Sequence, residues 1–92
     1  MQQTQKVRQQ LERAMIGVEA ELGEIANGKP SVSTRRELEF IAASLREMLE
    51  SLSLNRIIEV PGLWRVITDT WPYTNELGQQ IVEAEYSYQH LK

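Results

Sequence analysis

The apolar residues of this chain recur at steps of three and four, and this spacing decides what the chain can fold into. Such steps place apolar side chains along one face of an α-helix. They extend over three long stretches, residues 4–26, 34–52 and 75–90. The repeating positions are Val7, Leu11, Met15, Val18, Leu22 and Ile25, then Leu38, Ile41, Leu45, Met48 and Leu52, then Leu77, Ile81, Ala84, Tyr88 and Leu91. No stretch alternates apolar and polar residues as a strand would, so the spacing predicts an all-α fold.

Turn and capping residues set the ends of these helices. Gly28 and Pro30 end the first, because glycine suits the left-handed backbone after a helix and proline cannot continue it. Thr34 is the expected N-cap of the second, with Glu37 completing a capping box. Thr74 is the expected cap of the last helix.

The stretch between the second and last helices is less regular. Pro61 fits the first position of a short helix over residues 61–69. Pro72 breaks that helix, because the residue before a proline avoids helical backbone angles. A chain of 92 residues has room for one hydrophobic core. We therefore expect one domain, residues 1–92, folded as a compact bundle of three main helices plus a short fourth.

The composition argues against catalysis. The chain has no cysteine, which excludes thiolate metal sites and cysteine nucleophiles, and its one histidine, His90, lies near the end. Glu83 and Glu85 are two residues apart and so diverge on a helix rather than forming an acid–base pair. No glycine-rich phosphate loop is present. We expect no enzyme activity, no cofactor and no metal site.

The charge of the chain is small but unevenly placed. A net charge of −3 argues against a nucleic-acid binder, which needs a surplus of lysine and arginine. The whole excess falls after residue 65, where Asp69, Glu76, Glu83 and Glu85 face Lys92 alone. This pattern leaves two readings open: a solvated helix face, or an acidic docking surface for a basic partner.

The sequence also bears on location. No run of 18 apolar residues occurs, so no membrane span is expected. The first residues are followed by no apolar segment of the kind found in secretory signals. Together with the lack of cysteine, this predicts a cytoplasmic protein.

Three aromatic residues within ten positions invite a functional interpretation. Trp64 is expected to fill the gap between short helices, whereas Trp71 and Tyr73 flank a proline in a loop. For these two, the roles of core filler and interface anchor stay open, since rigid aromatic loop residues often anchor interfaces. With the neighbouring carboxylates, the candidate partner-binding residues are Asp69, Trp71, Tyr73 and Glu76.

Several short stretches between Ala14 and Tyr88 occur in the same order as in a known family of proteins. They are Leu38-Glu39-Phe40-Ile41, Arg56 leading through apolar residues to Gly62, a threonine-rich acidic loop ending in Glu76-Leu77, and Ala84-Glu85-Tyr86. In this order they resemble a family of small helical immunity proteins of bacterial type VI secretion systems. The loop departs from the family pattern at Trp71-Pro72-Tyr73, where a more acidic segment is expected.

The resemblance implies a binding protein that neutralises a cognate toxin domain, one that hydrolyses NAD(P), by occluding its active site. An acidic inhibitor would complement the positive charge of a cleft that binds phosphates. The alternative is a helical secretion chaperone or an adaptor protein. Self-association of the chain also stays open.

Overall fold

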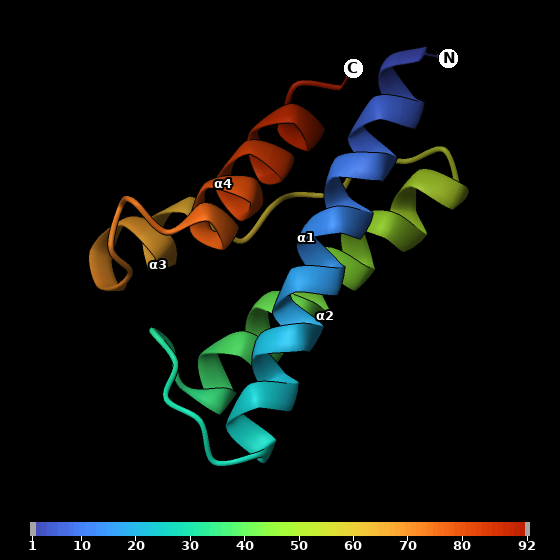
Figure 1. Ribbon diagram of the computed structural model, residues 1–92. Helices are drawn as coiled ribbons and strands as arrows, with labels where there is room; N and C mark the ends of the chain where they lie inside the picture. Colours follow the sequence, from blue (N-terminus) through green and yellow to red (C-terminus); the bar gives the residue numbers. More distant parts are fainter. Residues whose placement is uncertain (1, 92) are drawn as a thin grey trace.

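Four helices build the protein, as seen in a computed structural model that describes residues 2–91 (Figure 1). The helices are α1 (Gln2–Ala26), α2 (Arg35–Ser53), α3 (Leu63–Thr70) and α4 (Glu76–Gln89). No strand occurs within residues 2–91, and the predicted all-α fold with one short helix is confirmed. The radius of gyration, 12.9 Å, is close to the value of about 12 Å typical of one compact domain of this length.

Helix α1 is the longest helix, and both α2 and α4 pack on it. It packs against α2, with which it forms an antiparallel pair, and against α4 (Figure 1). The short helix α3 packs on α4. The segment from residue 54 to residue 62 has no regular structure and connects α2 to α3.

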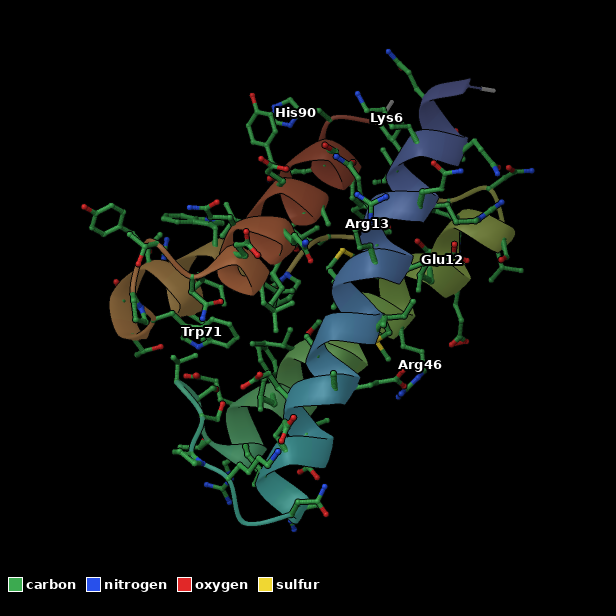
Figure 2. All side chains as sticks on the ribbon, viewed as in Figure 1. Lys6, Glu12, Arg13, Arg46, Trp71 and His90 are labelled. Carbon is green, nitrogen blue, oxygen red and sulfur yellow. The ribbon has the colours of Figure 1, made fainter. Side chains whose placement is uncertain are left out.

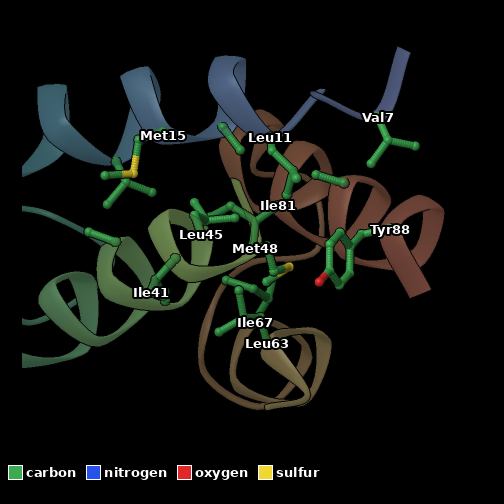
Figure 3. Packing of buried hydrophobic residues seen from close by; sticks show 14 of the residues in the cluster. Val7, Leu11, Met15, Ile41, Leu45, Met48, Leu63, Ile67, Ile81 and Tyr88 are labelled. Atoms are coloured by element: carbon green, nitrogen blue, oxygen red, sulfur yellow. The ribbon is translucent and has the colours of Figure 1, made fainter. Parts of the chain in front are cut away.

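The apolar stripes of the helices converge on one hydrophobic core (Figure 3). Its fully enclosed members include Leu11, Val18, Leu38, Ile41, Leu45, Met48, Leu63, Ile81 and Tyr88. Gly17 lets α4 approach α1 closely, because a Cβ at this position would lie 2.5 Å from Leu77 Cδ1. The first helix pair and α4 thus share a single core.

The helix ends differ in part from the prediction. Gly28 has a φ of 81°, the left-handed conformation expected after α1. Thr34 caps α2, since its Oγ1 accepts a hydrogen bond from Glu37 N at 3.1 Å. The cap of α4 is Asn75 rather than Thr74, because Asn75 Oδ1 accepts from Gly78 N at 2.9 Å. The helix therefore begins one residue later than a cap at Thr74 would place it.

The start of α3 is also corrected by the structure. The helix begins at Leu63, two residues after the expected Pro61, with Gly62 as N-cap in a left-handed conformation (φ 78°). Glycine adopts this backbone without the strain that a Cβ would cause. Gly62 has no side chain to cap the helix, so the first N–H groups of α3 need another acceptor.

Candidate partner-binding site

A groove runs between α3 and α4 on the molecular surface. It consists of two hollows, of about 680 and 280 Å³, that share Thr68 and Val82 and therefore adjoin. The larger is lined by Trp64, Thr68, Val82, Glu85, Tyr86, Gln89 and His90. The smaller is lined by Ile67, Thr68, Pro72, Tyr73, Asn75, Gly78, Gln79, Val82 and Glu83. We refer to the two together as the α3–α4 groove.

A buried carboxylate on α4 holds one wall of the groove in place. Glu85, only 1% exposed, accepts hydrogen bonds from Leu63 N at 2.7 Å and from Trp64 N at 3.0 Å. These are the first two N–H groups of α3, where a helix carries partial positive charge and favours an anion. Glu85 thus supplies the cap that Gly62 lacks, and it fixes where Trp64 stands.

Trp71 holds the other end of α3. Its indole is 4% exposed, and Nε1 donates a hydrogen bond to Glu37 Oε1 at 2.9 Å. The ring also lies against the first turn of α4, since a Cβ at Gly78 would lie 3.2 Å from Trp71 Cε3. Figure 2 shows Trp71 pointing from the end of α3 toward α2. The loop after α3 is therefore joined to two other helices.

A third tether comes from Tyr88 on α4. Its hydroxyl accepts a hydrogen bond from Ile58 N at 2.8 Å and lies 2.5 Å from Ser51 Oγ. The ring is fully enclosed in the core (Figure 3). The segment that leads from α2 into α3 is thus bonded to both α2 and α4.

Exposed aromatic rings border the groove. Trp64 is 45% exposed, Tyr86 63% and Tyr73 87%. The rings of Tyr86 and His90 lie 4.2 Å apart between centroids, and the guanidinium carbon of Arg65 lies 5.2 Å from the centre of the Trp64 ring. His90 stands at the far end of α4 (Figure 2). These rings give the groove flat, exposed apolar walls.

The charge around the groove is mostly negative. Asp69, Glu76 and Glu83 are exposed, and Arg65 is the only arginine or lysine between residues 63 and 91 of the sequence. Glu85 does not add to the accessible charge, because it is buried beneath α3. The acidic excess seen in the sequence, reduced by this buried carboxylate, therefore lies on α3 and α4, with Glu83 in the lining of the groove.

The structure sorts the predicted site residues into two groups. Asp69, Tyr73 and Glu76 are exposed, and Tyr73 lines the groove. Trp71 is enclosed, so its predicted role as a surface anchor is corrected: its indole N–H is satisfied by Glu37 and its ring is covered by α4. The core-filler role that the sequence left open is the one it has.

Trp64 is corrected in the opposite direction. The sequence predicts a gap filler, but nearly half of its surface is accessible, because Leu63 and Ile67 are the α3 residues that face the core. Tyr86 was missed altogether. It lies between Ala84 and Tyr88, off the apolar stripe of α4, and this offset is the signal that predicts an exposed tyrosine.

Two other kinds of site are absent from the described part of the chain. Residues 2–91 contain no group of three or more histidine, aspartate or glutamate side chains placed to hold a metal ion. Among the helices described, none combines the length and apolar character needed to cross a bilayer.

Comparison with protein-family models and with curated protein sequences finds no match to this chain.

Proposed function

We propose that the protein is an immunity protein that binds a cognate bacterial toxin domain and occludes its active site. The observation that carries this proposal is the α3–α4 groove, which is lined by three exposed aromatic rings and by the exposed carboxylate of Glu83. The toxin is expected to hydrolyse NAD(P), and the setting is type VI secretion between bacteria, on the resemblance described above. The protein acts in the cytoplasm as a binder and not as a catalyst.

The groove offers what a tight protein interface needs. Exposed tyrosine and tryptophan are favoured anchors, because they bury a large area at a small cost in side-chain entropy. Tyr73, beside the groove, is the most exposed of the three rings. We assign the anchoring role on this loop to Tyr73 alone, while Trp71 supports the loop from within.

The carboxylates support the same proposal through charge. A cleft that binds the phosphates of NAD(P) tends to be basic, so an acidic face is attracted to its mouth. Asp69 and Glu76 are exposed near the two ends of the loop that carries Tyr73. They would mainly speed the encounter, whereas the aromatic residues would slow dissociation.

The direct test uses a purified NAD(P)-hydrolysing toxin domain as the candidate partner. NAD(P) hydrolysis by that domain is measured while the purified chain is titrated in, and we expect complete inhibition near equimolar amounts. Tyr73→Ala should raise the dissociation constant at least about tenfold, or roughly 1.4 kcal/mol. Phe40→Ala is the matched control, because Phe40 is also exposed but lies on α2, outside the groove.

The charge contribution is tested by kinetics. Asp69→Asn with Glu76→Gln should lower the association rate and flatten its salt dependence, with little change in the dissociation rate. Full toxin activity in the presence of excess wild-type chain would refute the proposed function.

A further inference from the structure

The shape of the α3–α4 groove limits what can lie in it. Its smaller hollow reaches Asn75 and Gly78 at the start of α4, and its larger hollow reaches Gln89 and His90 at the end. The groove therefore follows all 14 residues of α4, a length of about 21 Å. This length suits an occupant of three to four helical turns.

The walls of the groove favour a helix over an extended strand. The backbone groups within α3 and α4 are bonded inside their own helices, and the first N–H groups of α3 are bonded to Glu85. An extended peptide would find no row of free backbone groups to pair with. An amphipathic helix needs only an apolar groove for its own apolar stripe.

The aromatic rings and the charge together define the polar chemistry of the occupant. The guanidinium of Arg65 lies over one face of the Trp64 ring, so a guanidinium from the partner would displace it or take the other face. The larger hollow is also lined by Tyr86 and His90, whose rings are tilted by 32° to each other. Aromatic faces attract cations, and the planar guanidinium stacks on them better than an ammonium group does.

We propose that the α3–α4 groove binds an arginine-bearing amphipathic helix of the partner protein, with a guanidinium group received between Trp64 and Tyr86. This inference rests on the proposed function, since it specifies the part of the toxin domain that the groove takes. The exposed carboxylate of Glu83 on α4, which lines the smaller hollow, and that of Asp69 on α3 complement the positive charge of such a helix.

The probe for this test is a synthetic amphipathic peptide as long as α4, 14 residues, with arginines spaced three and four apart. Its control is the same peptide with citrulline in place of arginine, which keeps the shape and removes the charge. Binding to the full chain is followed by NMR through the two indole N–H signals. We expect the Trp64 signal to shift and the buried Trp71 signal to stay, with at least about tenfold tighter binding of the arginine peptide.

Substitutions test whether the preference for the arginine peptide arises in the groove. Trp64→Ala and, separately, Tyr86→Ala should remove the preference for arginine over citrulline, and Phe40→Ala should keep it. Phe40 is 46% exposed, nearly the same as Trp64, so it controls for the loss of an exposed ring. Equal binding of the two peptides, absence of binding, or an equal loss with Phe40→Ala would overturn the inference.

The toxin assay separates this inference from the function on which it rests. If the wild-type chain inhibits the toxin domain and Trp64→Ala inhibits it equally well, the inference is wrong and the proposed function stands. If the arginine peptide binds as expected but the toxin domain is not inhibited, the proposed function is wrong and the chemistry of the groove stands.

Discussion

Helices α1 and α2 meet through apolar side chains, whereas the chain between residues 54 and 75 combines a few buried apolar side chains with hydrogen bonds to the rest of the molecule. In the first pair, the stripes that include Leu11, Val18 and Leu45 interlock in the core. In the second region, Glu85, Tyr88 and Trp71 each make one of the attachments. The two regions thus differ in how far they depend on hydrogen bonds from side chains.

This difference has a consequence for stability within the molecule. Apolar packing is spread over many contacts, so the loss of one group leaves the others in place. The short helix α3 buries only Leu63 and Ile67 and depends on a few bonds of defined geometry. Regions with few buried apolar contacts open locally at lower free energy than the core. We expect α3 and its flanking segments to open before α1 and α2 do.

The largest loss of stability is expected from a substitution at Trp71, where the two regions meet. Trp71→Ala removes a buried ring and its bond to Glu37 and should lower the free energy of unfolding by about 3–5 kcal/mol. Chemical denaturation measures this loss. A change below about 1 kcal/mol would mean that Trp71 does not join α3 to the rest of the core.

Within the first region, a substitution at Leu45 tests whether α1 and α2 form the common base of the fold. It is fully enclosed in the middle of α2, so Leu45→Ala should cost about 2–5 kcal/mol. Hydrogen exchange should show faster opening across all four helices, because the loss acts on the shared core. Loss of protection in α3 alone would contradict the view that α1 and α2 form the common base.

Within the second region, Glu85 provides the test. Glu85→Ala leaves Leu63 N and Trp64 N without their acceptor and should cost about 1–3 kcal/mol. Amide exchange should rise in α3 far more than in α2. Glu85→Gln is the matched control: it keeps one carbonyl acceptor and should lose less. Uniform exchange in both helices would remove the distinction between the two regions.

The smallest effect on stability is expected at Tyr73. Its side chain is almost fully exposed, so Tyr73→Ala should change the free energy of unfolding by less than about 0.5 kcal/mol. Thermal melts of this variant and of Trp71→Ala compare two aromatic residues of one loop. A large loss with Tyr73→Ala would show that the loop depends on both rings.

The sequence predicts the first region much better than the second. Stripes such as Leu38, Ile41 and Leu45 show directly which face of a helix is buried, because helical spacing and packing coincide. The hydrogen bonds that attach α3 leave no such periodic pattern in the sequence. Glu85 lies one residue from Ala84 on the buried face of α4, but a carboxylate in the sequence is indistinguishable from a solvated one until its partners are known.

The two tryptophans show the same limit at the candidate site. The sequence predicts a gap filler at Trp64 and leaves Trp71 open between core filler and interface anchor, because the burial of both depends on how α3 is turned against α4. That orientation is set by contacts over long sequence distances, Leu63 with Glu85 and Trp71 with Glu37. The exposed positions of Asp69, Tyr73 and Glu76 followed from local polarity and a proline-containing loop, which short-range patterns do record.

The capping of α3 by Glu85 also bears on how such a protein can diversify. The carboxylate holds α3 through backbone N–H groups, which every residue other than proline possesses. The side chain at position 64 can therefore change without loss of the bond that places it, and the outward-facing positions 73 and 86 are equally free of core contacts. Specificity is a difference between affinities and is altered by a few such substitutions. A chain built in this way can change the surface of its groove while its architecture is inherited unchanged.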